Sequence, residues 1–287
     1  MNRIQSALHP ATVFVLVLAL VGGTVQAQDD EDDKWYLTAE LSTVSASGNT
    51  ESMTYGLGST IGFLFPHSEI KIEGGGVLSE SNLGLEYVDQ ADTTDLLRRD
   101  SLVRTAEAYY ARGRYDFKFA RYFLAMAGVD WLRNTFAGID SRTLIGVGLG
   151  NSWKDTEKTK FRTNYSGTYT FQRDVVEDPF NKTEFPGIRL SYELWAQLTG
   201  AAEFESELRF DINLDNSDDL RANWYNALPI SISSVLAFKP ALALLWRNQP
   251  SFATVPVLDA TGTEVGTANV RLKKLDTFFT MALVVRI

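Results

Sequence analysis

Residues 160–172 read KFRTNYSGTYTFQ, and this stretch decides the fold of the chain. Phe161, Tyr165, Tyr169 and Phe171 fall on one face when alternate residues are taken, and the other face is wholly polar. A two-residue period is that of a β-strand. Strands of soluble sandwiches usually have about 5–6 residues, whereas a transmembrane barrel strand needs about 9–11 residues, apolar toward lipid and polar toward the interior. The stretch therefore predicts a strand of a transmembrane β-barrel.

The same alternation recurs from residue 35 to the end of the chain and predicts an all-β fold, an antiparallel transmembrane β-barrel of about twelve strands. The expected strands cover about residues 35–42, 53–65, 69–80, 100–115, 122–133, 143–153, 160–172, 188–194, 203–214, 220–236, 241–248 and 273–287. The fourth is the least regular, because Glu107 falls on its apolar side. Pro229 predicts a bulge or weak point in the tenth, because proline cannot donate to a strand ladder. An even count places both termini on the periplasmic side.

The connections between the expected strands alternate in length. Short turns are expected near Pro66, Lys118, Asp155, Gly200 and Lys239-Pro240, and longer loops at about 89–100, 134–142, 173–183 and 249–271. Aromatic residues gather near both sets, at Phe65, Tyr115, Phe117, Phe123, Trp153, Phe161 and Phe204, and at Trp131, Phe136, Phe171, Trp224 and Trp246. Short periplasmic turns, long outer loops and two aromatic girdles are typical of outer-membrane barrels, and a soluble sandwich explains neither feature.

The loop at 249–271 has a pattern of its own. Residues 255–258 and 264–270 are strand-like and flank the turn-like sequence Asp259-Ala-Thr-Gly262. We therefore predict a β-hairpin that extends above the barrel mouth or folds over it.

The first 27 residues have the pattern of a signal peptide. Arg3 supplies a positive charge, residues 11–21 form an apolar run, and Val25-Gln26-Ala27 is a small-residue cleavage site. That run is too short to cross about 30 Å of hydrocarbon as a helix. We expect a cleaved signal peptide at 1–27, an acidic tail at 28–34 and the barrel at 35–287, exported to the cell outer membrane.

Composition limits the partners. The chain contains no cysteine, which excludes a lipoprotein anchor and disulfides, and its formal net charge of −9 argues against a nucleic-acid partner. The expected partners are outer-membrane lipids and the barrel-assembly machinery, with small solutes or ions passing through.

Residues 131–150 (WLRNTFAGIDSRTLIGVGLG), together with Ser47-Gly48-Asn49-Thr50, resemble the salt-induced outer membrane protein (YdiY-like) family, a domain of unknown function. The resemblance covers about residues 35–287. It implies an outer-membrane location and a link to stress, and it supplies no catalytic or binding residues. The chain ends in Ile287, whereas many outer-membrane barrels end in an aromatic residue that assists assembly.

No group of residues indicates catalysis, and we predict no catalytic, cofactor-binding or metal-ligating residues. His67, the histidine of the mature chain, falls in an expected periplasmic turn, away from any nucleophile at the outer rim. Asp215, Asp218 and Asp219 could bind Ca²⁺ weakly, but they lack EF-hand spacing and fit a solvated turn better. The inward Gly56, Gly58, Gly62, Gly146, Gly148 and Gly150 fit a role in making room for curvature or bulky neighbours.

The predicted inner face is charged. Alternation directs ten acids inward, Glu40, Glu69, Glu73, Asp130, Glu193, Glu203, Glu205, Glu207, Asp211 and Asp276, and seven bases, Lys71, Arg112, Arg114, Arg162, Arg189, Arg209 and Arg286. This small acidic excess predicts a narrow passive channel, a porin for ions or small solutes with a weak cation preference. The alternatives are a structural or stress-protective barrel filled by side chains and, less favoured, an enzyme.

Three of the acids are spaced two residues apart on one strand. Glu203, Glu205 and Glu207 therefore form a carboxylate ladder near the periplasmic mouth. Unpaired carboxylates are costly in a dry interior, so we expect either water or bases such as Arg162, Arg189 and Arg209 beside them.

Overall fold

The computed structural model describes residues 34–47, 52–89, 92–178, 181–258 and 264–287. The expected signal peptide at 1–27 and all but the last residue of the acidic tail lie outside these residues. Among the described residues, no helix is long and apolar enough to cross a membrane.

The described chain is built almost entirely of strands. Their bounds are β1 Lys34–Ser47, β2 Ser52–Leu64, β3 Ser68–Asp89, β4 Asp92–Lys118, β5 Phe123–Asn134, β6 Ile139–Thr156, β7 Thr159–Asp174, β8 Glu184–Gln197, β9 Glu203–Asn213, β10 Leu220–Ala227, β11 Ile230–Ser231, β12 Leu236–Arg247, β13 Phe252–Leu258, β14 Glu264–Arg271 and β15 Leu275–Arg286, with a single 3₁₀ turn, η1 Thr135–Ala137, between β5 and β6.

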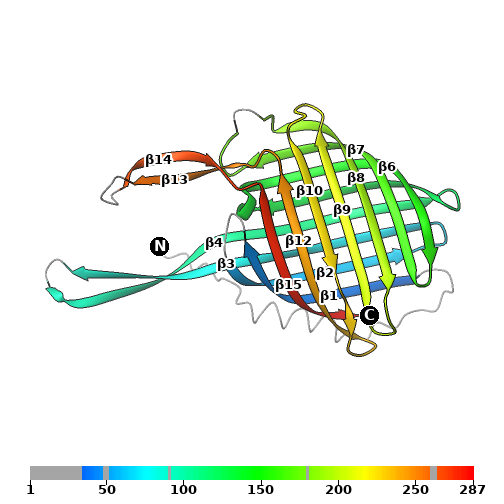
Figure 1. Ribbon diagram of the computed structural model, residues 1–287, viewed down its shortest axis with the longest axis horizontal. Helices are drawn as coiled ribbons and strands as arrows, with labels where there is room; N and C mark the ends of the chain where they lie inside the picture. The colour runs from blue at the N-terminus through cyan, green and yellow to red at the C-terminus, as the bar shows by residue number, and fades with distance from the viewer. Residues whose placement is uncertain (1–33, 48–51, 90–91, 179–180, 259–263) are drawn as a thin grey trace, which may run out of the picture. The chain divides into compact units, whose positions relative to one another are not determined.

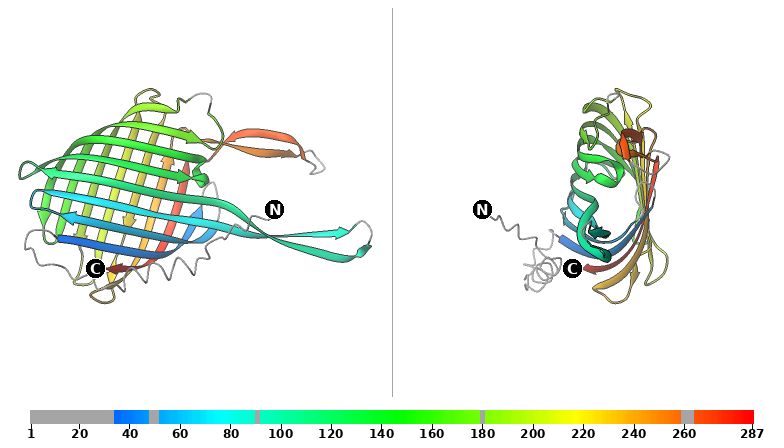
Figure 2. Two further views of the ribbon diagram at one scale, coloured as in Figure 1. Left: turned by 180° about the vertical axis from the view of Figure 1, so that it is seen from behind. Right: turned by 90° about the vertical axis from the view of Figure 1, so that its left-hand side faces the viewer.

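These strands close into a barrel. Each strand from β1 to β10 pairs antiparallel with its neighbour in sequence, β12 pairs with both β10 and β15, and β15 returns to β1 (Figures 1 and 2). Because β10 and β11 are two parts of one strand, the barrel has twelve antiparallel strands, as predicted. Closure satisfies the backbone groups that an open sheet edge would expose to lipid.

The chain enters and leaves the barrel at the same end. Leu37 and Ile287 exchange backbone hydrogen bonds of 2.9 Å in both directions, which places the first and last strands side by side there. The short turns after β2, β4, β6, β8 and β11 lie at this end, which we call the short-turn end. The opposite end, with η1 and the β13–β14 hairpin, is the long-loop end.

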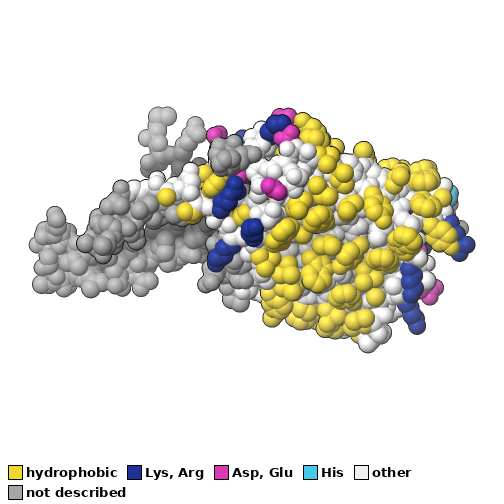
Figure 3. Space-filling view, turned by 45° about the horizontal axis from the view of Figure 1, so that its top comes forward, with side chains coloured by type: hydrophobic (Ala, Val, Ile, Leu, Met, Phe, Trp, Pro, Cys, Tyr) yellow, Lys and Arg dark blue, Asp and Glu magenta, His cyan; other side chains and the backbone are white. Residues whose placement is uncertain are grey.

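The outer wall is apolar and is bordered by exposed aromatic residues. Phe65, Phe117 and Trp153 are exposed near the short turns, and Trp131 and Trp224 toward the long loops. Figure 3 shows hydrophobic side chains covering the wall, with Lys and Arg gathered at its two ends. This distribution agrees with the girdles expected from the sequence.

The predicted loop at 89–100 is wrong. β3 continues to Asp89 and β4 begins at Asp92, and beyond Leu78 and Ala108 these two strands pair only with each other. A two-stranded ribbon outside the barrel wall needs no lipid-facing side, so its sequence lacks the alternation that marks the other strands.

The predicted turn at Lys239-Pro240 is also wrong, because both residues lie inside β12 and the turn occupies residues 232–235. The expectation for Pro229 is confirmed, since the strand is interrupted between β10 and β11 at this residue. Leu228 donates to the carbonyl of Pro240 at 3.0 Å, but Pro240 has no N–H with which to return the second bond of the pair. The two prolines thus weaken the ladder without ending the strand.

Inward glycines allow close strand packing, as the sequence suggested. A Cβ added at Gly148 would lie 2.2 Å from the backbone oxygen of Tyr165 on β7, whereas a Cβ at Gly146 would come no closer than 3.4 Å to any atom, the Thr168 methyl group, and 3.7 Å to the Gly167 oxygen. Both glycines lie on β6, two residues apart and on the same face. Of these two positions, only 148 requires a glycine because of the backbone of the neighbouring strand.

This difference gives a stability prediction. Gly148→Ala forces β6 and β7 apart, and we expect it to lower the free energy of unfolding by about 1–3 kcal/mol. Gly146→Ala is the matched control and is expected to be nearly neutral. Urea titration of the folded protein in detergent measures both, and equal stability of the two variants would contradict the packing described here.

Candidate functional site in the barrel interior

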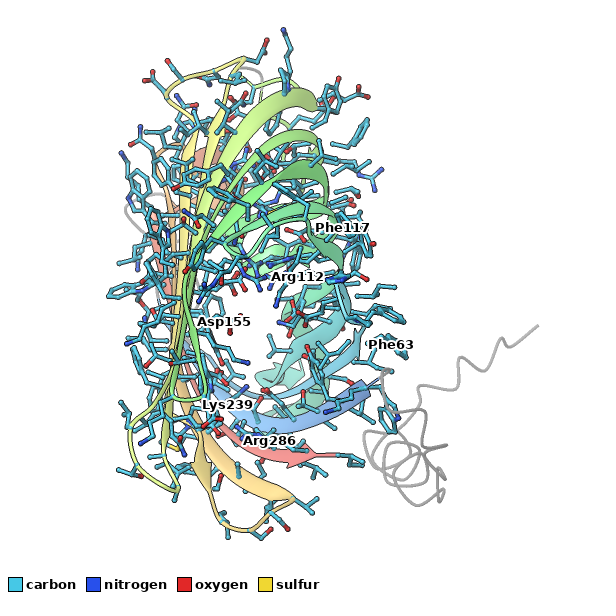
Figure 4. The ribbon with its side chains drawn as sticks, turned by 90° about the vertical axis from the view of Figure 1, so that its right-hand side faces the viewer. Phe63, Arg112, Phe117, Asp155, Lys239 and Arg286 are labelled. Carbon is cyan, nitrogen blue, oxygen red and sulfur yellow. The ribbon has the colours of Figure 1, made fainter. Side chains whose placement is uncertain are left out.

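A large cavity runs inside the barrel, and we call it the lumen. Its volume is about 870 Å³, and all twelve barrel strands contribute to its lining. The lining extends from Asp155 and Lys160 at the short-turn end to Arg142, Arg247 and Pro250 at the long-loop end. Figure 4, which faces the short-turn end, shows Arg112 and Lys239 directed inward and Phe63 and Phe117 outward.

Most of the inner-face residues expected from the sequence line this lumen. Those found there are Glu40, Glu69, Lys71, Glu73, Arg112, Arg114, Asp130, Arg162, Arg189, Glu193, Glu205, Glu207, Arg209, Asp276 and Arg286. The other two, Glu203 and Asp211, lie outside the lining but pair with arginines that belong to it. Arg286 reaches Glu203 at 3.1 Å, and Arg189 reaches Asp211 at 2.6 Å.

One group of charges joins β4 to two strands farther along the wall. Arg114 on β4 pairs with Glu193 on β8 and, at 2.7 Å, with Asp116. Asp116 also accepts from Arg162 on β7 at 2.7 Å, and Glu193 accepts from the Asn164 amide at 3.0 Å. Each carboxylate therefore has more than one donor, which compensates its burial.

Arg189 on β8 joins two further strands. Its guanidinium pairs with Asp130 on β5 and makes two hydrogen bonds to Asp211 on β9. Only 15 % of the Arg189 side chain is exposed, so one arginine neutralises two carboxylates in a largely buried position. This pairing links β8 to both β5 and β9.

Toward β1 the contacts involve fewer partners. Lys239 pairs with Glu40, which brings β12 to β1 across the intervening β15. Lys71 and Glu73 pair at 2.7 Å along β3, and Tyr36 donates to Glu69 at 3.1 Å. Sequence reasoning missed Lys239 because it assigned this residue to a turn.

Two of the three carboxylates in the β9 ladder pair with bases. Glu203 pairs with Arg286 and Glu207 with Arg209, while Glu205 has no ion pair with any residue that the structure describes. Of the bases suggested for this ladder, Arg209 pairs with Glu207, whereas Arg162 and Arg189 pair instead with Asp116, Asp130 and Asp211.

The charge of the lumen differs from the expected acidic excess. Among the described residues, its lining contains ten acids and fifteen bases, the latter being Lys71, Arg112, Arg114, Lys118, Arg142, Lys160, Arg162, Arg189, Arg209, Arg221, Lys239, Arg247, Lys273, Lys274 and Arg286. The acidic excess was expected because the count from the sequence left out bases at strand ends and bases in segments predicted to be loops. Arg142 was assigned to the loop before β6. It lies an even number of residues before the inward Gly146 and Gly148, so the strand alternation directs it inward as well.

The long-loop mouth is narrowed by the chain that leads into the β13–β14 hairpin. Ser251 is fully buried, and a Cβ on Gly138, after η1 on another part of the wall, would lie 2.8 Å from the Ser251 Cβ. Gln249 accepts from Asn216 at 3.0 Å, and Arg271 donates to the Pro250 carbonyl at 2.8 Å. The predicted hairpin is confirmed, with residues 259–263 at its turn outside the described residues. Its base lies over the mouth.

The remaining candidate residues serve local structure. His67 is exposed in the turn between β2 and β3. Asp215 accepts from Lys182 at 2.6 Å, and Asp219 pairs with Arg221. Asp219 lies between β9 and β10; burial alone would raise its pKa, but the neighbouring Arg221 outweighs burial and lowers the pKa. No group of three His, Cys, Asp or Glu residues in the described part of the chain could hold a metal ion.

Glu107, the irregular residue of β4, contacts Arg133 at 2.5 Å. Arg133 also pairs with Asp140, which accepts from Arg173 at 2.7 Å. These four charges form a cluster near the long-loop end. The break in the β4 alternation therefore reflects an ion pair between neighbouring strands.

Comparison with known proteins agrees with this architecture. No curated protein matches the chain. Among solved structures, the chain is similar to the NanC porin, with a TM-score of 0.50 and 10% identity over 85% of this chain and 98% of that one. It is also similar to the KdgM porin in complex with disordered oligogalacturonate (TM-score 0.41, 10% identity, 86% and 98% covered) and to an anion-selective porin from Comamonas acidovorans (0.38, 11%, 89% and 100%).

The first of these similarities supports the fold alone. The barrel has the architecture of an outer-membrane porin. A family model described as "Protein of unknown function, DUF481" matches residues 39–285, nearly the whole barrel. The chain therefore belongs to the DUF481 family.

Proposed function

We propose that this protein is a narrow passive channel for ions or small solutes in the bacterial outer membrane. The observation that carries the proposal is the lumen, one cavity of about 870 Å³ whose lining reaches both ends of the barrel. Spread over the roughly 25 Å height of an outer-membrane apolar belt, this volume corresponds to a mean cross-section on the order of 35 Å². Such a width suits small solutes in single file.

The lining supports a water-filled path. Glu205, Arg112 and Lys160 line the lumen without a close ion pair, Arg112 lying 3.9 Å from Glu73 and over the Tyr110 ring. Charged groups without close partners are tolerated where water reaches them. The cation preference expected from the sequence has less support, because bases outnumber acids in the lining. The channel is therefore proposed without that preference.

Conductance across a planar lipid bilayer tests the proposal. The purified, folded barrel is expected to give stepwise ohmic currents in potassium chloride, and liposomes that contain it are expected to swell in small solutes. Heat-dependent migration on gels provides the control, because it confirms that the protein added is folded. Folded protein without conductance would favour the alternative, a structural barrel without transport.

Export and a role in stress are separate proposals. The sequence of residues 1–27 supports cleavage near Gln28, which N-terminal sequencing of the mature protein would test. A link to salt stress rests only on the resemblance of residues 131–150. Equal growth in high salt of cells with and without the protein would contradict this link. We propose no enzymatic activity, because the sequence pattern indicates no nucleophile beside a base.

A further inference from the structure

Three arginines line the long-loop end of the lumen. Arg221 on β10 is directly opposite Arg247 on β12 in the strand register, and both line the cavity. Arg142 on β6 lines it as well, and the charges that act on it include those of Arg221 and Arg247. Like charges directly opposite each other destabilise a sheet unless something neutralises them.

Only one of the three is fully neutralised by the protein. Arg221 makes two hydrogen bonds to Asp219, and its side chain is almost wholly buried. Arg247 donates through Nη1 to the Ser251 hydroxyl at 2.8 Å, while its Nε is buried with no hydrogen-bond partner. Arg142 has no hydrogen bond or ion pair with any residue in the described part of the chain.

The acids whose charges act on Arg247 have other partners: Asp178 pairs with Arg271 at 3.5 Å, and Asp174 accepts from the Gln172 amide at 2.7 Å. The acids nearer Arg142 and Arg221 are paired as well. Asp211 and Asp130 both pair with Arg189, and Asp219 pairs with Arg221. Asp276 lines the same end of the lumen and has a partner of its own. Lys273 and Lys274 add further positive charge to this lining. The arginines therefore keep guanidinium donors available toward the cavity.

A guanidinium is a planar fork of N–H donors that matches the oxygens of a carboxylate or a phosphate. The strands fix the backbones of all three arginines, so little movement is needed to bind such a group. Pro250 and Ser251, which are buried at the mouth, shield the site on its outer side, which strengthens charge-assisted hydrogen bonds there.

We propose that Arg142, Arg221 and Arg247 form a binding site for an oxyanion, the carboxylate or phosphate group of a small solute, at the long-loop end of the lumen. The inference deepens the proposed channel function and rests on it for the solute's path. Solutes that carry such a group are concentrated at the mouth before they pass along the lumen. Binding itself is measurable without conduction.

The test compares the wild-type barrel with Arg142→Gln/Arg247→Gln, which keeps the Arg221–Asp219 pair. Arg173→Gln is the matched control, because Arg173 is an arginine near the same end whose side chain is 73 % exposed outside the lumen lining. Inorganic phosphate is titrated into each folded protein by calorimetry, and phosphate inhibition of the chloride current is measured in bilayers. Heat-dependent migration confirms that all three proteins are folded.

We expect the double variant to bind phosphate on the order of tenfold more weakly or worse, because each arginine contributes charged hydrogen bonds, and Arg173→Gln to bind as wild type. Absence of phosphate binding by the wild type, or equal binding by all three proteins, would overturn the site. If the protein conducts ions but binds phosphate equally well without Arg142 and Arg247, the channel proposal stands and the binding site is rejected. If phosphate binding depends on these arginines but the protein does not conduct ions, the binding site stands and the channel proposal is rejected.

Discussion

Replacing Arg189 by methionine is expected to lower the free energy of unfolding by about 3 kcal/mol, because it leaves two largely buried carboxylates without their counter-charge. Asp130 and Asp211 lie on different strands, and Arg189 is the base that both contact. Methionine fills a similar length without charge. The loss therefore measures the electrostatic bridge and not a cavity.

Equilibrium unfolding in urea, with the protein in detergent, measures this loss. Arg173→Met is the control, because Arg173 pairs with Asp140 at 2.7 Å but its side chain is 73 % exposed, and such a surface pair contributes only about 0–1 kcal/mol. Adding Asp130→Asn and Asp211→Asn to Arg189→Met should restore much of the stability, because the uncompensated charges are then removed. A loss no larger than that of Arg173→Met would mean that water already solvates both carboxylates.

Gly58→Phe is expected to reduce the channel conductance several-fold. Gly58 on β2 lines the lumen, and a Cβ there would lie 3.7 Å from Glu40 Cβ and 3.8 Å from the Tyr110 hydroxyl, an ordinary contact distance. The strand backbone can therefore accept a side chain, but the ring has to occupy the lumen. In a channel this narrow, the ring obstructs much of the path for ions.

The control is the same substitution on the opposite face of the wall. A Cβ at Gly167 on β7, an exposed position, would meet nothing within 4 Å, so Gly167→Phe adds the same ring without narrowing the lumen. Single-channel currents in potassium chloride, recorded on protein shown to be folded, compare the two variants with wild type. Equal currents from Gly58→Phe and Gly167→Phe would show that ions do not pass Gly58, and the proposed path would be lost.

The sequence alone determined the barrel and much of its inner face. In a barrel wall one side of each strand meets lipid and the other the interior, so a two-residue period fixes which side chains share a face. This rule placed Arg112 and Glu193 inside and Tyr165 outside, and they are found there. The rule failed in the β3–β4 ribbon beyond Leu78. Neither face of this ribbon meets lipid, so nothing requires apolar and polar residues to alternate there.

The tertiary structure alone decided how the inner charges are paired. Alternation states that Arg114, Arg189 and Glu193 point inward, but the curvature of the closed sheet brings β4 toward β8 and β5 toward β8. The opposition of Arg221 and Arg247 likewise depends on the register of β10 against β12, which no local pattern contains. Faces follow from the geometry of a single strand, whereas partners follow from closure of the whole barrel. The excess of base in the lumen therefore emerged only from the folded chain.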